Sequence, residues 1–456
     1  MEQKILNGLE EMANFTFTTK YARYDEKKGR RETWDETVSR VEKMHLKKFN
    51  FLSEKDKNEI VKAFDLVRQK RITPSMRSMQ FGGKAVEAHN GRIFNCAVRH
   101  IDSIRSFAES FYTLLCGTGV GFGLTNFFLN RLPDLVTAED KTGTVITYVV
   151  QDNIEGWGDS VEALLNCYFK NTAYSGRKIV FDYSRIRAKG AKLKTGGGKA
   201  PGYKGLKNAH KKIKALLDHI IEDNKQKRFK TIDAYDTLMH CADAVLSGGI
   251  RRSACSVIFE ATDEDMMNAK TGNWFEKSPQ RARSNNSAII IRGKTTYKEF
   301  VKLIEKTKEF GEPGFLYVID EKQLLNPCFE ISFIPMTADG RCGFQFCNLT
   351  SINGAKVTSL EEFKEASWAA SLIGTLQAAY TTFPYLGHTS EELTRSEALL
   401  GVSITGMMDN PDVLFNPKYQ KEAAKVAVET NKEWAKKIGI KQAARAWTVS
   451  AGHRTP

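Results

Sequence analysis

One short run of the sequence carries three side chains whose chemistry is complementary. It reads Asn326-Pro327-Cys328-Phe329-Glu330. In extended backbone, residues two apart project from the same side at roughly 6–7 Å spacing, so we expect the amide, thiol and carboxylate to converge. A carboxylate beside a thiol disfavours the thiolate that ordinary nucleophilic catalysis needs. The pattern indicates a sulfur that carries a hydrogen atom while Glu330 handles protons. On these residues alone, an inert buried cysteine in a turn before a strand is the more common explanation of such a run.

The other cysteines give no second signal of their own. The chain has eight cysteines, and none forms the C-x-x-C pair of a structural zinc site or a thioredoxin-like motif. We therefore expect no metal site. In a reducing compartment most cysteines behave as small buried hydrophobic residues.

Glycine-rich runs are candidates for binding anions, because backbone amides approach an anion closely there. None has the spacing of a P-loop, and each is equally well explained as a turn where two backbones pass close together. The run at 247–253 is the most suggestive, because Arg251 and Arg252 follow Gly248 and Gly249. The others are 117–123 (a G-x-G-x-G run), 195–198 and 81–84.

Charge and hydropathy limit the class of protein. The 68 Lys and Arg outnumber the 54 Asp and Glu, a net charge of +14, which favours polyanionic partners. The basic residues form only short runs such as 211–212 and 225–228, a pattern that suits nucleotides at least as well as a duplex. No stretch approaches the roughly 20 apolar residues of a membrane helix, and the N-terminus has no secretory pattern. We expect a cytoplasmic protein with no membrane contact and no direct nucleic-acid partner.

The elements that must position these residues alternate along the chain. Helical periodicity predicts helices over 104–115, 157–169, 206–221, 235–246 and 297–310, with β-rich runs at 178–181, 256–259, 288–291 and 315–318. Ser53 is expected to cap a helix that ends before Pro74. The alternation indicates an α/β architecture with much parallel sheet. We expect a helical N-terminal region over 1–72 and one catalytic domain over 73–456.

Seven segments together resemble the catalytic subunit of ribonucleotide reductases. The run at 326–331 is similar to that family's radical-cysteine finger loop, here near 325–332. The remaining segments follow in the family's order: Thr73-Pro74-Ser75-Met76-Arg77, Phe94-Asn95-Cys96, 247–253, 283–287, 311–314 and Cys347-Asn348-Leu349. The resemblance runs from about Tyr21 to the C-terminus. It implies the family's ten-stranded α/β barrel, incomplete at the C-terminal end, with the helical region in front of it.

The resemblance also implies a role for each residue. Cys328 becomes a thiyl radical and abstracts the substrate's 3′ hydrogen, Glu330 takes the 3′-hydroxyl proton, and Asn326 binds the hydroxyls. Cys96 and Cys347 supply two electrons and end as a disulfide, which an external thioredoxin-like dithiol resets. Thr73, Ser75 and Asn95 bind the ribonucleotide, and the loop with Gly248, Gly249, Arg251 and Arg252 reads a deoxynucleotide or ATP effector.

Segments 21–24, 29–30 and 32–37 resemble the adenosylcobalamin-dependent, class II triphosphate reductases most. In those enzymes the cofactor's cobalt–carbon bond supplies the initiating radical. The stretch 123–157 is short beside the insertion of the monomeric enzymes, so a homodimer is expected as an option. The family's C-terminal phosphate loop and cysteine pair are not expected here, since the sequence departs from the family after 446–449.

Two other functions remain open at this stage. One is a large subunit that receives its radical from a separate metalloprotein. The other is a basic nucleotide-binding or nucleic-acid-binding protein without turnover. The sequence does not distinguish diphosphate from triphosphate substrates.

Overall fold

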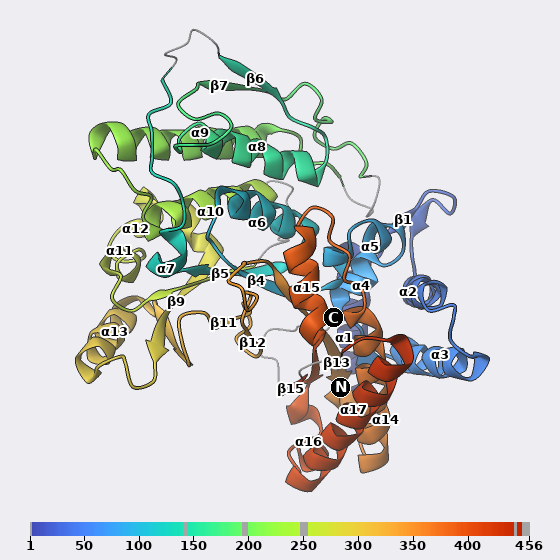
Figure 1. Cartoon of the computed structure of the whole chain (residues 1–456). Coiled ribbons are helices and arrows are strands. Elements are labelled where there is room, and N and C mark those ends of the chain that lie inside the picture. The colour runs from blue at the N-terminus through green and yellow to red at the C-terminus, as the bar shows by residue number, and fades with distance from the viewer. Residues whose placement is uncertain (1, 140–144, 194–198, 247–253, 442–444, 449–456) are drawn as a thin grey trace.

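The computed structural model describes residues 2–139, 145–193, 199–246, 254–441 and 445–448. Its centre is one mixed sheet of nine strands, ordered β10-β9-β8-β5-β4-β13-β14-β15, with β3 paired to β13 beside β4 (Figure 1). The strands are β3 (Ile72–Thr73), β4 (Cys96–His100), β5 (Gly119–Leu124), β8 (Cys255–Glu260), β9 (Ser284–Ile291), β10 (Gly314–Val318), β13 (Gln345–Asn353), β14 (Leu399–Thr405) and β15 (Arg445–Thr448).

The sheet consists of two parallel halves joined antiparallel. Strands β10, β9, β8, β5 and β4 run parallel to one another, and so do β13, β14 and β15. The halves meet where β4 pairs antiparallel with β13. The α/β class is confirmed. The main sheet has nine strands among the described residues, and β10 and β15 have no outer partner there, so a tenth strand stays a prediction.

The sheet curls around a short hairpin. This finger hairpin consists of β11 (Leu324–Leu325), a turn, and β12 (Ser332–Phe333). Its side chains Leu324, Ile331 and Phe333 belong to a compact apolar cluster with residues of β4, β8, β9, β10, β13 and β14. A much larger apolar core lies between the sheet and its helices. The hairpin thus fills the concave side of a half-barrel whose outer side the helices cover.

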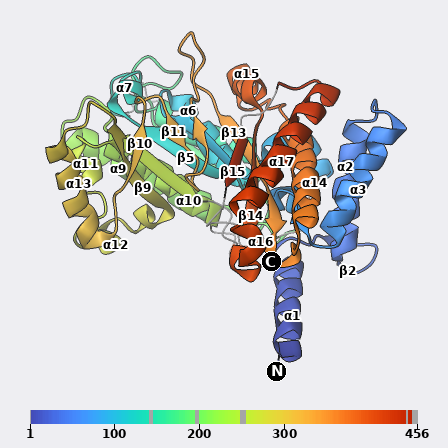
Figure 2. The same cartoon turned by 90° about the horizontal axis from the view of Figure 1, so that it is seen from below.

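Helices pack on the outer side of the sheet and around its ends (Figure 2). The longest, α17, packs against α14. The helices around the main sheet are α4 (Met76–Phe81), α5 (Lys84–Ala88), α6 (Ile104–Cys116), α7 (Asn126–Leu129), α10 (Thr231–Leu246), α11 (Glu264–Met267), α12 (Trp274–Lys277), α13 (Tyr297–Phe310), α14 (Leu360–Ala378), α15 (Gly387–Glu397), α16 (Pro411–Leu414) and α17 (Pro417–Ile438). None of the described helices is long and apolar enough to cross a membrane.

The N-terminal region is mainly helical. It contains α1 (Glu2–Lys20), α2 (Trp34–Lys48) and α3 (Glu54–Arg68), with a small hairpin of β1 (Tyr24–Asp25) and β2 (Arg30–Arg31). The Ser53 side chain accepts a hydrogen bond from the Asp56 amide, so the predicted cap is confirmed. The domain boundary at residue 72 stays a prediction, because β3 crosses it and joins the main sheet.

A separate layer follows β5 in the chain and covers α6. It consists of α8 (Ile154–Asn166), α9 (Lys204–Asp218) and a small parallel sheet of β6 (Ile146–Val149) and β7 (Ile179–Asp182) (Figure 1). Helix α8 packs on α6, and α9 packs on α10. Buried His210 ties the layer together, because its ring contacts the Ser160 hydroxyl at 2.9 Å and the Tyr183 hydroxyl at 2.8 Å.

The predicted elements agree with this structure except at their ends. The helix predicted over 297–310 has those bounds, and the four predicted strands are β7, β8, β9 and β10. The helix predicted over 157–169 begins earlier, because the Asn153 side chain accepts from the Gly156 amide and caps it. The helix predicted over 206–221 ends as α-helix at Asp218 and continues as a π turn over His219–Asp223.

Candidate active site

The finger hairpin places Cys328 at its tip. The Phe329 amide donates to the Asn326 carbonyl at 2.8 Å, so residues 326–329 form a turn with Pro327 at its second position, where proline is favoured. Phe329 has a φ of 64°, a left-handed conformation that is rare for an aromatic residue. The extended backbone predicted for this run is therefore wrong, because the proline closes a turn.

Strand β5 makes room for the hairpin. Its glycines at alternate positions point toward the hairpin: a methyl group at Gly121 would lie 2.9 Å from the Leu325 carbonyl oxygen, and one at Gly123 would lie 2.9 Å from Leu324. At Gly119 the nearest hairpin atom, in Pro327, would be 3.6 Å away. The G-x-G-x-G run therefore lets backbone approach backbone and is no anion cradle.

Three cysteine sulfurs gather at the junction of the two half-sheets. Cys328 Sγ lies 4.0 Å from Cys96 Sγ. Cys96 on β4 and Cys347 on β13 are directly opposed antiparallel partners, and both are buried, whereas Cys328 is exposed. Opposed residues of antiparallel strands have Cβ atoms about 4.5–5.5 Å apart, a spacing from which a disulfide forms with small adjustments.

The surroundings hold these thiols protonated. The hydrogen bond to Cys96 raises the pKa of Cys328 far above its ordinary value, and burial and the charge of Glu330 raise it further. For Cys96 the hydrogen bond with Cys328 acts in the opposite direction, but Cys347 and burial outweigh it and the pKa is raised. The cluster favours thiols over thiolates, so it suits hydrogen-atom transfer better than nucleophilic attack.

Asn326 and Glu330 converge as predicted, although through the turn. The Asn326 side-chain amide donates to Glu330 Oε1 at 2.7 Å, and its carbonyl accepts from the Ile331 amide at 3.0 Å. Burial raises the pKa of Glu330. Its second oxygen, Oε2, is buried and has no hydrogen-bond partner among the described residues. A buried oxygen without a partner is costly, so Oε2 indicates a place where a ligand hydroxyl would bind.

Ser75 is joined to the cysteine cluster by a chain of buried amides. The Ser75 amide donates to Gln377 Oε1 at 3.1 Å, and Gln377 Nε2 donates to Asn348 Oδ1 at 2.8 Å, next to Cys347. The Ser75 hydroxyl is itself buried without a partner among the described residues. Thr73 lies in β3, where it pairs with Ser351 of β13. Strand β13 also carries Cys347.

Asn95 has a more structural position than expected. Its side-chain oxygen accepts from the Leu349 amide at 2.9 Å, which fixes β13 beside β4. Gly248, Gly249, Arg251 and Arg252 lie outside the described residues, so their position is not defined. Among the described residues, no group of three or more His, Cys, Asp or Glu side chains could hold a metal ion.

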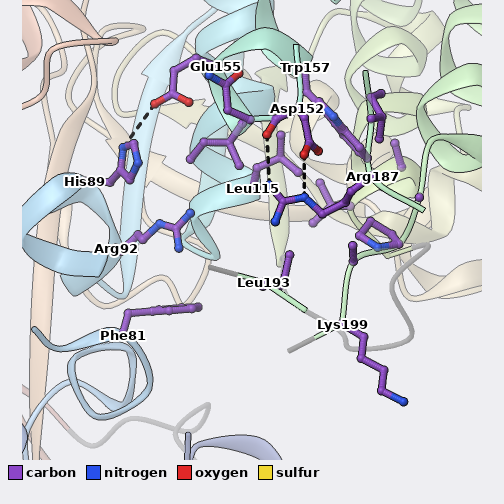
Figure 3. A pocket seen from close by; sticks show the side chains of 18 residues that line it. Phe81, His89, Arg92, Leu115, Asp152, Glu155, Trp157, Arg187, Leu193 and Lys199 are labelled. Atoms are coloured by element: carbon purple, nitrogen blue, oxygen red, sulfur yellow. Dashed lines mark hydrogen bonds and ion pairs between the residues drawn. The ribbon is translucent and has the colours of Figure 1, made fainter. Parts of the chain in front are cut away.

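A cavity lies between the α8–α9 layer and the body of the molecule (Figure 3). Arg92, stacked over Phe81, faces it from one side, and Arg187, paired with Asp152 at 2.7 Å, faces it from the other. The Nε atom of Arg92 is buried without a partner among the described residues. Ala244 and Val245 from the end of α10 also line it, directly before the run 247–253.

Comparisons with known proteins identify the relatives of this chain. A family model described as the insertion domain of B12-dependent ribonucleotide reductase matches residues 134–217. The adenosylcobalamin-dependent ribonucleoside-triphosphate reductase of Euglena gracilis is 26% identical over 445 residues, and that of Lactobacillus helveticus is 25% identical over 483 residues. The chain is similar to the B12-dependent, class II ribonucleotide reductases.

The class II similarity covers most of this chain. The two alignments include 88% of it, but only 56% and 62% of the respective relatives, so the chain spans less than two thirds of their length. A solved structure of a B12-dependent class II ribonucleotide reductase superposes with a TM-score of 0.79 at 21% identity. That superposition covers 95% of this chain and 72% of the other, and it shows a shared fold.

The class II insertion corrects one sequence-based expectation. The stretch 123–157 was expected to be too short for the insertion of the monomeric enzymes, but the insertion-domain model matches 134–217. The insertion extends through α8, β7 and most of α9, elements that the sequence pattern assigned to the catalytic domain. The argument for a homodimer that rested on a short insertion therefore no longer holds.

Sequence reasoning also missed residues of this site. Gln377 lies within α14 and gives no sequence signal, because a single polar residue in an apolar helix is indistinguishable from an exposed one. Arg92 and Arg187, which line the cavity from opposite sides, come from segments far apart in the chain. Only the fold brings them to one cavity.

Proposed function

We propose that the chain is the catalytic part of a ribonucleotide reductase that converts ribonucleotides to 2′-deoxyribonucleotides. The observation that carries this is the cluster at the β4–β13 junction: Cys328 Sγ at 4.0 Å from Cys96 Sγ, with Cys347 opposite Cys96. A hydrogen-atom carrier thus stands beside a pair of thiols that can give up two electrons. The Asn326–Glu330 pair adds a proton acceptor on the same hairpin.

The proposed steps balance in atoms and electrons. The Cys328 sulfur radical takes the 3′ hydrogen, and Glu330 accepts the 3′-hydroxyl proton. The 2′-hydroxyl leaves as water, while Cys96 and Cys347 supply two electrons and two protons and join as a disulfide. Cys328 then returns the 3′ hydrogen, and Glu330 returns the proton to the 3′ oxygen, which restores the 3′-hydroxyl. The net change is one hydroxyl replaced by hydrogen, one water formed and one dithiol oxidised, so an external dithiol must reduce the pair again.

The substrate would occupy the buried polar atoms that lack partners. Glu330 Oε2 suits a ribose hydroxyl, because it is buried and faces no donor among the described residues. The Ser75 hydroxyl, with Thr73 on the adjoining strand, suits the phosphates. Asn326 positions Glu330 by its 2.7 Å hydrogen bond and would bind the hydroxyls from the same side.

Adenosylcobalamin is the proposed radical source. The residues present fit this group in one respect: Cys328 is exposed, with half-buried Phe329 beside it, so a large cofactor would reach the sulfur without moving the core. When bound, the cofactor would supply the initiating radical from its cobalt–carbon bond. The residues of this chain then hold the sulfur, the substrate and the proton in place.

Further partners follow from the same proposal. A deoxynucleotide or ATP effector would act through Gly248, Gly249, Arg251 and Arg252, next to the cavity that Arg92 and Arg187 line. The half-barrel would be completed toward ten strands at its open edges, β10 and β15. A cytoplasmic location fits the eight free thiols.

One experiment tests the reaction and the cofactor together. A ribonucleotide is incubated anaerobically with the chain, adenosylcobalamin and dithiothreitol, and deoxynucleotide formation is measured by chromatography. We expect product that depends on the cofactor. Product formed only after a metal-containing protein is added would favour the alternative large subunit. Nucleotide binding without product under either condition would contradict the proposed reaction for this chain.

A further inference from the structure

The positive charge of this chain is concentrated in one segment. Residues 185–230 contain fifteen Lys and Arg against three Asp and Glu, a net charge of +12. The whole chain carries +14, so the remaining residues are close to neutral. The short basic runs noted in the sequence, 211–212 and 225–228, both fall within this segment. The segment includes α9 and both of its flanks.

Helix α9 turns its apolar face inward and its lysines outward. Leu206, Ala209, Ile213 and Leu217 are buried. Lys204, Lys207 and Lys211 stand on the opposite face at helical spacing and are exposed. None of these three takes part in an ion pair among the described residues. Lys214 lies on the same face but pairs with Asp218 at 2.5 Å.

Further exposed lysines lie beyond both ends of the helix. Lys189 before it, and Lys225 and Lys227 after it, likewise have no ion pair within the described part of the chain, whereas Lys199 lines the cavity of Figure 3. Figure 1 places α9 on the outer layer of the molecule, apart from the finger hairpin β11–β12. The proposed reaction does not use this face.

The chemistry of the face selects among polyanions. An anionic membrane surface binds amphipathic helices through an exposed apolar face, and that of α9 is already buried in the core. An acidic protein partner would need aromatic or apolar anchors, and Tyr203, 38% exposed at one end of α9, is the sole large apolar side chain exposed within the described part of 185–230. A phosphodiester backbone needs neither, because regularly spaced cations suffice.

We propose that the α9 face binds the phosphodiester backbone of double-stranded DNA without sequence specificity. From Lys204 to Lys211 the helix rises about 10 Å, and a duplex carries one charge per roughly 1.7 Å of its axis, so three ammonium groups meet at least three phosphates. This binding holds a deoxynucleotide-forming chain on the polymer that such products extend. It differs from the substrate and effector contacts, and it revises the expectation of no direct nucleic-acid partner.

Fluorescence anisotropy with a labelled duplex of arbitrary sequence tests the proposal. The variant Lys204→Gln/Lys207→Gln/Lys211→Gln is compared with Lys418→Gln/Lys421→Gln/Lys425→Gln. The control lysines have the same spacing, lie on the exposed side of α17, and have no ion pair among the described residues. Equal melting temperatures establish that both variants are folded.

The expected results are quantitative. The plot of log K against log salt for the unmodified chain has a steep negative slope, and the α9 variant makes that slope shallower by about 2.7, or 0.9 for each lost phosphate contact. Its affinity at low salt falls at least about tenfold, while the α17 variant stays within about twofold of the unmodified chain. Deoxynucleotide formation without DNA is the same in all three proteins, so this test is independent of the proposed reaction.

Several results would overturn the proposal. These are no duplex binding at about 50 mM salt, equal losses in the two variants, or binding to phosphatidylserine vesicles that the α9 variant loses as strongly as DNA binding. Poly-L-glutamate competing as well as DNA at equal charge would indicate an acidic protein partner instead.

Discussion

Cys96 and Cys347 face each other across the antiparallel junction that joins the two halves of the sheet. Because opposed residues there have neighbouring Cβ atoms, the two sulfurs can form a disulfide with little movement of either strand. The junction thus supplies the geometry of a two-electron donor, and Cys328 stands 4.0 Å from one of its members.

The disulfide is the first testable consequence. One turnover without added dithiol should remove two titratable thiols per chain, and peptide mapping should place the new bond between Cys96 and Cys347. Cys347→Ser should stop the reaction with dithiothreitol, because no second thiol closes the disulfide. A bond found between Cys96 and Cys328 instead would contradict the proposed division of roles.

Cys328→Ser should abolish product formation and leave nucleotide affinity unchanged, because an oxygen does not replace sulfur as a hydrogen-atom carrier. Equilibrium dialysis with the substrate nucleotide measures the affinity. Cys342→Ser is a suitable control, since the Cys342 sulfur accepts a hydrogen bond from Arg131 at 3.7 Å and lies outside the three-cysteine cluster. Full turnover by Cys328→Ser would remove this residue from the mechanism.

Glu330 predicts a pH dependence. Burial raises the pKa of this carboxyl above its ordinary value, and only the ionised form accepts the substrate proton. The rate should therefore rise with pH through the raised pKa and then level off. Glu330→Gln should lose most activity, and its remaining rate should no longer rise with pH in the acidic range. If that rise persists in the variant, the ionisation of another group causes it.

The same shift has a consequence for stability. Below a pH of about 4.5 a carboxyl whose pKa is raised by folding is protonated in both the folded and the unfolded chain, and its contribution to stability is fully present. This contribution is lost as the pH rises through the pKa of the folded state. Glu330→Gln should therefore raise the free energy of unfolding at pH 7 relative to the unmodified chain, with no gain at pH 4. Urea titrations at the two pH values measure it.

Gly121→Ala should disturb the finger hairpin. The added methyl group would lie 2.9 Å from the Leu325 carbonyl oxygen, so strand or hairpin must shift. We expect a loss of about 1–3 kcal/mol in stability and a larger loss of turnover. Gly119→Ala is the matched control on the same strand, because its nearest contact would be an ordinary 3.5 Å. Equal effects of the two changes would contradict this account.

His45 should make the fold sensitive to acid. It is fully buried, and burial lowers its pKa to about 3. Its neutral form stabilises the fold above pH 6.5, and this contribution is lost as pH falls from 6.5 toward 3. At pH 4.5 the loss is about 3 kcal/mol relative to pH 7. In chemical denaturation, the free energy of unfolding of His45→Leu should fall less between pH 7 and pH 4.5 than that of the unmodified chain, by this amount. An unchanged pH response would contradict the assignment.

The sequence predicted elements well where local signals were strong. Ser53 caps its helix, and the helix at 297–310 has the predicted ends because Thr296 caps it and Gly311 ends it. The turn at 326–329 was predicted as extended backbone, since the geometry at Phe329 depends on packing around the hairpin. The role of Gly119, Gly121 and Gly123 could not be recognised before the hairpin's position was known.

The sequence predicted which residues belong to the site, but not the contacts that join them. Resemblance to a family, rather than spacing, placed Cys96 and Cys347 together, because contacts between residues so distant in sequence leave no local pattern. The amide chain from Ser75 through Gln377 to Asn348 was not predicted for the same reason. The length of the segment that matches the insertion-domain model, 134–217, was not predicted, because α8 and α9 have the same amphipathic pattern as the helices around the main sheet.

Cys96 and Cys328 touch although 232 positions separate them in the chain. Contacts of such sequence separation require closure of a very long loop, and they form late in folding. Of the two proposed electron donors, Cys96 belongs to one half-sheet and Cys347 to the other. The proposed dithiol therefore forms only when β13 pairs with β4, and a chain in which the half-sheets have not yet joined would lack it.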